Sequence, residues 1–360
     1  MVNWEGPWGT GPYKLVEGFS RPDVRSDRIV LQANLDYYDP SRFPRLQRII
    51  FDNTLDQKKA VELVKTSEGQ VDVVTELRPL DTLRVAESPF AKVVKNRGAL
   101  LTVFGQFNML KMESPWRDLR LRQAANLAIN REDLIRYAAK GNGVVIPALL
   151  PAQTFGHDPD LKPYPFEPAK ARVLLREAGY PDGLALTLIA PEDLEVQAIV
   201  VGKMLEQGGF TVTLEILDPT AFERKTVLSH LDQPSEHQPW DIALTSMHDH
   251  GDFSGPFFLY HQFALDGVYD WVVEEPELRR LYEEMLGTVD REHQQQVVRQ
   301  MERHTRDQAY FLFLYNPIQL FAVNKAAEFV PHVITLLRLA ETGVTEEHWS
   351  VHKQKIAVQE

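Results

Sequence analysis

A regular alternation of strand-like and helix-like segments limits the fold of this chain more than any other feature of its sequence. The predicted order is strand, helix, strand, helix and strand, in the ranges Leu184–Ile189, Glu192–Gln207, Phe210–Leu217, Thr220–Leu231 and Trp240–Thr245. Two successive right-handed strand-helix-strand units accommodate this order most simply, and they place the strands parallel in one sheet. Ligands of such sheets bind outside the carboxyl ends of the strands.

The loop that leaves the last of these strands holds the densest group of polar and ionisable residues in the chain. It reads Ser246-Met247-His248-Asp249-His250-Gly251-Asp252. A carboxylate such as that of Asp249, placed in a sheltered cleft, makes charge-assisted hydrogen bonds to a cation of fixed geometry. An Asp in a loop with glycine is also a common turn former, so the residues alone leave the role of Asp249 open.

Histidines flank this Asp on both sides, and a third histidine follows nearby. They are His248, His250 and His261. Neutral imidazoles are common ligands of transition metals, and alternate residues of an extended strand share a face, so such a pair can chelate a metal ion. Pairs of this kind are more often exposed polar residues. A metal site at these histidines is therefore an alternative, and the main prediction includes neither a metal nor a cofactor.

The segments on both sides of the alternating region predict a mixed α/β protein with two lobes. At 360 residues, the chain exceeds what one hydrophobic core usually serves. The extended apolar stretches Leu100–Met109 and Tyr310–Tyr315 predict two crossings of the chain between lobes. We therefore expect a partial first lobe over residues 1–104, a second lobe with the ligand loop over 105–311, and a return into the first lobe over 312–360.

Local signals predict the ends of several helices outside the alternating region. Asp118 is expected to cap one helix, and Asn130 to cap the next, over Arg131–Lys140. A third helix is expected over Ala169–Ala178. Pro168 takes its first position, and Gly179 follows its end. Further expected elements are the strands Tyr13–Glu17, Asp27–Asn34, Arg45–Asp52, Val71–Val74 and Leu320–Val323, and the helices Leu55–Ser67, Glu277–Gly287 and Glu292–Gln308.

Composition argues against several classes of function. The formal net charge of -12 opposes binding to nucleic acid, which needs a surplus of Lys and Arg on at least one face. The chain has no cysteine, which removes thiol nucleophiles, thiolate metal ligands and disulfides. We find no nucleophile elbow, His-Glu-x-x-His helix, phosphate loop or dinucleotide fingerprint, so we expect no enzyme, with a hydrolase of scattered catalytic residues as the remaining alternative. We also see no signal peptide and no apolar stretch of membrane-spanning length.

An ordered set of short motifs covers nearly the whole chain. The motifs are Gly9-Thr10-Gly11-Pro12-Tyr13, Asn34-Leu35-Asp36-Tyr37-Tyr38, Gly69-Gln70-Val71-Asp72-Val73, Asn108, Arg120-Leu121-Arg122-Gln123-Ala124, Ala128-Ile129-Asn130-Arg131, Pro163-Tyr164-Pro165-Phe166 and Ala169 to Tyr180. In this order they resemble the bacterial extracellular solute-binding proteins of the oligopeptide, dipeptide and nickel type. Set against this resemblance, the long N-terminal region that members of the family carry before the Gly-Thr-Gly-Pro-Tyr motif is expected to be missing.

The resemblance implies a two-lobed periplasmic-binding-protein-like fold of type II, with an incomplete first lobe. It implies a substrate-binding component of an ABC importer, which binds peptides or similar small amine-bearing solutes in a cleft between its lobes. The expected partners are that solute and the permease subunits of the transporter, and the expected state is a monomer. The expected location is periplasmic or extracellular and membrane-associated. A receptor for nickel, a metal chelate or haem is the alternative within the family.

The same resemblance places Asp249 at the position of the Asp that holds the α-ammonium of a peptide in the family. The residues around it depart from the family pattern, because Ser246 and Met247 replace aromatic neighbours and Phe253 replaces a proline. We predict that the side chains of this segment contact the ligand. The candidates are Met247, His248, Asp249 and His250.

Further candidates lie at the two crossings and at the start of the last strand of the alternating region. Phe107 and Asn108 on the forward crossing and Tyr315 on the return crossing are expected to form the floor of the cleft. Trp240 can stack on a ligand side chain. Packing in the core is the alternative for each of the three aromatic residues.

Overall fold

The computed structural model describes residues 10–19, 26–67, 69–227, 237–248, 254–265, 267, 269–273, 276–333 and 337–351. The chain divides into two units, one formed by Met1–Arg97 with Gln319–Glu360 and the other by Gly98–Ile318. The chain therefore passes from one unit to the other twice, after Arg97 and after Ile318. The lobe boundaries expected after residues 104 and 311 lie within strands of the second unit.

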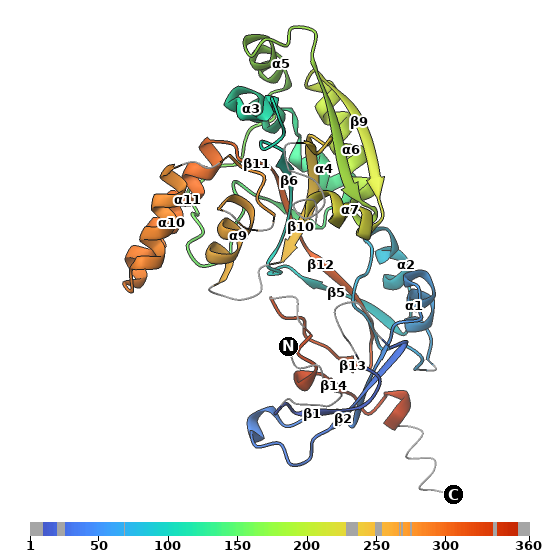
Figure 1. The fold of residues 1–360 in the computed structure, drawn as a ribbon. Helices are drawn as coiled ribbons and strands as arrows, with labels where there is room; N and C mark the ends of the chain where they lie inside the picture. The colour runs from blue at the N-terminus through green and yellow to red at the C-terminus, as the bar shows by residue number, and fades with distance from the viewer. Residues whose placement is uncertain are drawn as a thin grey trace, which may run out of the picture. The chain divides into compact units, whose positions relative to one another are not determined.

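The first unit is built from small antiparallel sheets (Figure 1). One sheet has the order β1-β2-β3, a second has the order β4-β12-β5, and β13 pairs with β14. Because β12 comes from the far end of the chain and pairs with β5 along its whole length, the C-terminal segment completes a sheet that the N-terminal segment begins. The bounds are β1 Tyr13–Glu17, β2 Arg28–Ala33, β3 Arg48–Asp52, α1 Gln57–Val64, β4 Val73–Val74, α2 Thr82–Ala86, β5 Ala91–Asn96, β12 Gln319–Asn324, β13 Ala327–Glu328 and β14 Gly343–Val344.

The second unit is organised around a six-stranded sheet with the order β7-β11-β6-β10-β8-β9. β8 pairs in parallel with both β9 and β10, as the alternating sequence pattern predicts. β6 is antiparallel to β10 on one side and to β11 on the other, so the two crossing strands lie in the middle of the sheet. The bounds are β6 Leu101–Phe107, β7 Gly143–Val145, β8 Leu184–Pro191, β9 Phe210–Leu217, β10 Ile242–His248 and β11 Phe311–Pro317.

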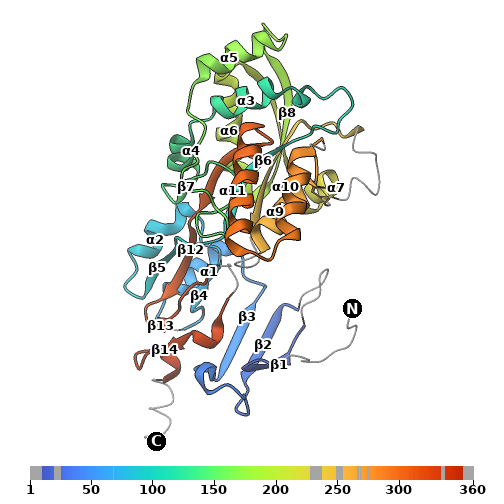
Figure 2. The same ribbon diagram turned by 90° about the vertical axis from the view of Figure 1, so that its left-hand side faces the viewer.

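Helices cover both faces of this sheet (Figure 2). On one face, Gln197 of α6 donates a hydrogen bond to the Tyr315 hydroxyl at 3.1 Å. On the other face, the ring of Phe263 of α9 meets that of Phe104 edge to face, with centroids 5.2 Å apart. The bounds are α3 Leu119–Ala128, α4 Arg131–Ala138, α5 Pro168–Glu177, α6 Glu195–Gln207, α7 Pro219–Thr226, α9 Ser254–Ala264, α10 Pro276–Gly287 and α11 Arg291–Asp307.

The residues predicted to cap the helices of this region make the expected contacts. The carboxylate of Asp118 accepts a hydrogen bond from the backbone N–H of Arg120, and Asn130 accepts one from that of Asp133. Pro168 opens α5, and Gly179 after its end has a φ of 97°, in the left-handed region that favours glycine. These local contacts explain why the helices of this region could be recognised from sequence.

A fully buried arginine joins the helices to the sheet. The guanidinium of Arg131 makes five hydrogen bonds, to the backbone carbonyls of Phe313, Asn126, Ile129 and Tyr164 and to the side-chain oxygen of Asn126. Burial lowers the pKa of Arg131 to about 10. Since backbone carbonyls rather than a carboxylate surround this cation, the role of this motif residue is to hold the fold of the second unit.

Candidate functional site

A cavity of about 190 Å³ lies in the second unit beside the carboxyl-terminal half of β10. Strand β10, helix α7, strand β6 and the segment after α9 all contribute to its wall. The lining residues are Gln106, Phe222, Glu223, Thr226, Val227, Thr245, Ser246, Met247 and Tyr269. The cavity is therefore next to the end of a parallel strand, where the alternating sequence pattern predicts a ligand.

Two tryptophans fix the helix that carries one wall of the cavity. The indole N–H of Trp240 donates to the carbonyl of Lys225, and that of Trp271 donates to the carbonyl of Thr226, each at 3.0 Å. These bonds satisfy carbonyls that the end of a helix leaves without partners. They hold the end of α7 at Thr226, and residues 228–231 of the predicted helix lie outside the described residues.

The segment after α9 is fixed in a similar way. The Gln106 side-chain amide donates to the carbonyl of Tyr269 at 2.7 Å, and the Tyr269 ring stacks on Phe263 with centroids 5.1 Å apart. Burial raises the pKa of Tyr269, and the negative charge of Glu223 raises it further. The Tyr269 ring is therefore held at the cavity, within the electrostatic influence of Glu223.

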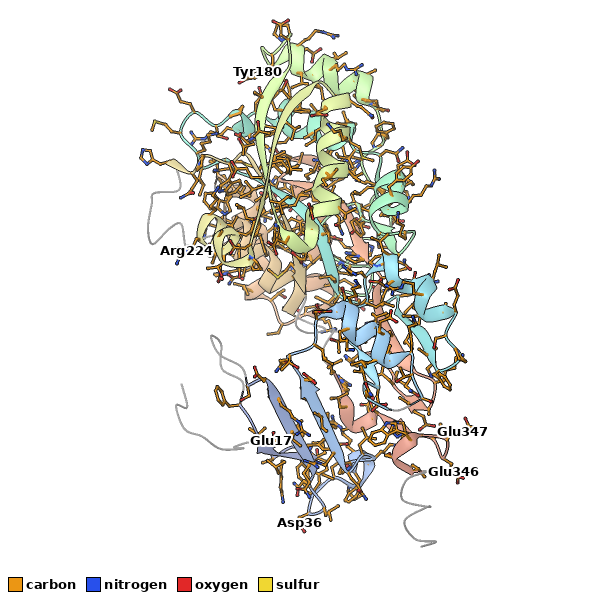
Figure 3. The ribbon with its side chains drawn as sticks, turned by 90° about the vertical axis from the view of Figure 1, so that its right-hand side faces the viewer. Glu17, Asp36, Tyr180, Arg224, Glu346 and Glu347 are labelled. Atoms are coloured by element: carbon orange, nitrogen blue, oxygen red, sulfur yellow. The ribbon has the colours of Figure 1, made fainter. Side chains whose placement is uncertain are left out.

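The cavity offers an acidic wall and polar groups that the fold does not use. Within the described residues, no hydrogen bond or ion pair engages the Glu223 carboxylate or the hydroxyls of Thr245 and Ser246. No lining residue carries a positive charge. Arg224, which follows Glu223 on α7, lies at the surface and does not line the cavity (Figure 3). Such a site suits a small cationic or hydrogen-bond-donating group with an apolar body.

Residues 3–270 match the sequence profile of the bacterial extracellular solute-binding proteins, family 5 middle region. The chain belongs to this family. The glutathione-binding protein GsiB of Salmonella paratyphi A is 30% identical to the chain over 192 residues, which cover 51% of the chain and 33% of GsiB. The dipeptide-binding protein of Pseudomonas aeruginosa is 30% identical over 184 residues, which cover 51% of the chain and 32% of that protein. The chain thus spans about a third of the length of the curated relatives that it matches.

Solved structures confirm the predicted α/β fold of the type II periplasmic binding proteins. The ABC transporter substrate-binding protein CtaP of Listeria monocytogenes has a TM-score of 0.79 and 22% identity, over 94% of this chain and 67% of CtaP. DppA of Helicobacter pylori in complex with the peptide STSA has a TM-score of 0.74 and 18% identity, over 93% of this chain and 63% of DppA. NikA of Brucella suis in complex with Fe(III)-EDTA has a TM-score of 0.77 and 18% identity, over 94% of this chain and 68% of NikA.

The names of these relatives bear on the question of catalysis. The two relatives, CtaP and DppA are all named as binding proteins. The expectation of a family 5 binding protein rather than an enzyme is therefore confirmed at the level of the family. Among the described residues, no helix combines the length and apolar character needed to cross a membrane.

The predicted ligand loop of this family 5 protein falls partly outside the described residues. Met247 lines the cavity. The backbone of His248 ends β10 opposite Leu101, and its side chain lies outside the described part. Asp249 and His250 lie outside the described residues altogether. The roles predicted for these three residues remain predictions.

Four other candidates lie in the core of the second unit, where none of them lines the cavity. Phe107, Asn108, Trp240 and Tyr315 each have 1% or less of their surface exposed. The Phe107 ring stacks on that of Trp116, and the Asn108 amide is bonded on both sides. Burial raises the pKa of Tyr315, whose hydroxyl is bonded to α6. Core packing, the alternative that the sequence left open for the aromatic residues, describes their surroundings.

The metal alternative gains no support from the described residues. His261 is exposed on α9, and its ring centroid lies 6.2 Å from that of Tyr282. Within the described ranges, no three or more His, Cys, Asp or Glu side chains are grouped so that they can hold a metal ion.

Of the residues that line the cavity, sequence reasoning named only Met247 as a ligand contact, and it missed Gln106, Glu223 and Tyr269 among others. Glu223 lies in a predicted helix with no motif around it, and Gln106 lies in a stretch whose apolar pattern predicts a core strand. Only the pairing of β6 with β10 and the packing of the segment after α9 bring them together. No local signal in the sequence marks them.

Proposed function

We propose that this chain provides the ligand-binding part of a solute receptor for an ABC importer, and that its ligand is a short peptide or another small solute with an amine. The observation that carries this proposal is the cavity beside β10, whose wall contains a carboxylate and no positive charge. Membership of family 5 supports the role in import. The relatives named for glutathione and dipeptides support a peptide-like ligand.

In this proposal the amine of the ligand is held by two carboxylates. Glu223 lies in the cavity wall, and Asp249 follows Met247 by two residues. An ammonium group forms charge-assisted hydrogen bonds with both, which are stronger than bonds between neutral groups. The hydroxyls of Thr245 and Ser246 bond to the polar part of the ligand, and its apolar part contacts Phe222 and Met247.

The receptor works outside the cytoplasm and delivers its ligand to the permease subunits. The proposal includes a hinge motion at the two crossings of the chain, after Arg97 and after Ile318. Because a ligand shifts an equilibrium between two conformations only by its difference in affinity for them, such a motion requires the ligand to bind one conformation more tightly than the other.

Isothermal titration calorimetry with pools of di- to pentapeptides tests the proposal. We expect heat from at least one pool and a loss of affinity of about tenfold to a hundredfold in Asp249→Ala and in Glu223→Gln, since a hydrogen bond to a charged group contributes about 1.5–3 kcal/mol. A matched control is Glu206→Gln on α6, because Glu206 lines a smaller groove of about 110 Å³ and pairs with Lys203. The control is expected to bind like the wild type.

N-terminal acetylation of a binding peptide gives the sharper comparison, because it removes the ammonium charge and little else. We expect acetylation to weaken binding to the wild type and to cause much less further loss in the double variant Asp249→Ala, Glu223→Gln. Absence of heat from every pool rejects a peptide-like ligand. Wild-type affinity in both single variants rejects the site, whatever the ligand.

A further inference from the structure

Helix α11 carries a carboxylate in the interior of the second unit. The side chain of Glu302 has 0% of its surface exposed, and its Oε2 atom lies 3.5 Å from Nδ1 of His157. The same oxygen accepts a hydrogen bond from the backbone N–H of Asp158 at 2.6 Å. The Asp158 carboxylate is paired with Arg303 of α11 at 2.5 Å. These contacts fasten the loop of residues 150–158 to α11.

A glycine allows this loop to approach the helix. Gly156 has a φ of +83°, and a Cβ atom built on it would lie 2.3 Å from a methyl carbon of Val298. Any larger residue there is strained in its backbone and collides with α11. The backbone of the loop therefore follows the surface of the helix from Val298 to Arg303.

Helix α9 carries a tyrosine that lies within the electrostatic influence of the same carboxylate. Tyr260 of α9 is fully buried, and burial raises its pKa well above the ordinary value, with the charge of Glu302 raising it further. The Oε1 atom of Glu302 and the Nδ1 atom of His157 have no hydrogen bond of good geometry in the described part of the chain, and the neighbouring Tyr260 and Thr305 hydroxyls interact only with each other, which moderates the raised pKa of Tyr260. A buried polar group without a partner costs stability, so the packing here is sensitive to the charge on Glu302.

Among the described cationic side chains near Glu302, His157 is the one that can balance the charge of its carboxylate. Arg303 pairs with Asp158, and Arg299 also acts on Asp158. Burial raises the pKa of Glu302, and the interaction with Glu302 raises the pKa of His157. The His157 side chain is 16% exposed, so water can exchange protons with its ring.

We propose that His157, Glu302 and Tyr260 form a proton-dependent latch that fastens the 150–158 loop and helix α9 to helix α11. Protonated His157 balances the carboxylate of Glu302 in the interior. When His157 loses its proton, the carboxylate stays buried without a cation, and the packing of the loop and of α9 on α11 becomes weaker.

The direction of the pH dependence follows from the two pKa values. Both are higher in the folded chain than the ordinary values of 4.5 for Glu and 6.5 for His. The folded chain therefore holds more protons than the unfolded chain as the pH rises from about 4.5 to beyond about 6.5. The stabilisation is fully present below these ordinary values and is lost as the pH rises through the higher folded values.

The latch is connected to the proposed ligand loop because helix α9 directly follows that loop in the sequence. Helix α9 begins at Ser254, directly after residues 249–253, which include Asp249. On the basis of the proposed function, looser packing of α9 at alkaline pH weakens the hold on the ligand loop, so affinity falls as the pH rises. The latch itself requires no ligand.

Hydrogen exchange of the ligand-free full chain, followed by mass spectrometry, tests the latch. Exchange is compared at about pH 5.5 and about pH 8.5, after division by the intrinsic rate at each pH. In the wild type, we expect the protection of peptides from 150–158 and 254–264 to fall several-fold at the higher pH, because the stabilisation is lost as the pH rises through the folded pKa values. Peptides from α5 are expected to keep their protection.

Variants separate the latch from general effects of pH. Glu302→Gln is expected to remove the pH dependence of both segments. The matched control is Glu284→Gln, since Glu284 and His293 form an exposed pair at 3.0 Å, and this variant is expected to keep the wild-type dependence. Should Glu302→Gln fail to fold, the double variant Glu302→Gln, His157→Gln removes both titrating groups and leaves two side chains that can hydrogen-bond to each other, so it is expected to lack the dependence instead.

The proposal is overturned by a wild type whose two segments keep constant protection, or by a Glu302→Gln variant, alone or combined with His157→Gln, that keeps the wild-type dependence. Because no ligand is present, these results are independent of the peptide titrations. Loss of the latch with normal peptide binding, or the reverse, identifies which of the two proposals has failed.

Discussion

Asn108 and Glu223 are both polar side chains of the second unit, and they have opposite surroundings. Asn108 is 0% exposed, donates to the Trp240 carbonyl at 3.1 Å and accepts from the Lys111 N–H at 2.9 Å. Glu223 is exposed at the cavity, where no described residue bonds to its carboxylate. The first residue has its hydrogen bonds fully used within the fold, and the second has its bonds available to a ligand.

The same contrast separates two aromatic residues. The indole N–H of Trp240 is bonded to the end of α7, and its ring meets that of Trp271 at an angle of 69°. Tyr269 is held through its backbone and ring, and it lines the cavity. A residue type suited to ligand contact is therefore weak evidence until its partners are known, because the fold itself uses many such groups.

The largest effect is expected from the most completely bonded side chain of the unit. Arg131→Met removes five hydrogen bonds and leaves buried carbonyls of β11 and of α3 without a donor. We expect the free energy of unfolding to fall by about 3–5 kcal/mol, measured by urea denaturation. Arg131→Lys keeps the charge and loses the planar fork, so it is expected to recover only part of this loss. A change below about 1 kcal/mol in the Met variant contradicts the structural role.

A smaller loss is expected at Asn108. Asn108→Ala leaves the Lys111 N–H and the Trp240 carbonyl without their partner and opens a small void, which we expect to lower the free energy of unfolding by about 2–3 kcal/mol. Asn108→Asp keeps the acceptor for Lys111, loses the donor for Trp240 and places a charge in the core, so it is expected to be no more stable than the Ala variant. Wild-type stability in both variants would mean that the fold does not need the hydrogen bonds of Asn108 and that they are available to a ligand, as those of Glu223 are.

Sequence predicts the elements of this fold best where the signal is local. β1 and β9 have the predicted bounds, and Asp118 and Pro168 open the predicted helices. α9 was not predicted, because its apolar residues surround the helix instead of forming one stripe. β5 was also not predicted, since it is defined by pairing with β12, which lies more than two hundred residues away in the sequence.

The residues of the candidate site are also difficult to predict where no local signal marks them. Topology alone points to the end of β10, and Met247 does line the cavity there. The burial of Trp240 and Asn108 could not be predicted, because Trp240 bonds to the end of α7 and the Asn108 amide donates to the carbonyl of Trp240, two contacts that no local pattern marks. The buried Glu302 has no signal either, since it occurs in a helix rich in charged residues.

The smallest effect on stability is expected at Glu223, and it completes the contrast with Asn108. Because no described residue bonds to its carboxylate, Glu223→Gln is expected to change the free energy of unfolding by less than about 0.5 kcal/mol. A local spectroscopic change should accompany this small effect. The charge of Glu223 adds to the effect of burial in raising the pKa of Tyr269, so the substitution is expected to lower that pKa while burial keeps it above the ordinary value.

Titration of tyrosine absorbance at alkaline pH measures this change, and Tyr269→Phe identifies the titrating group. The wild type is expected to show a tyrosine that ionises at a lower pH in Glu223→Gln and is missing in Tyr269→Phe. An unchanged titration would mean that Glu223 and Tyr269 do not share the cavity wall. A large loss of stability in Glu223→Gln would mean that the carboxylate holds the fold, and the contrast with Asn108 would then no longer locate the ligand.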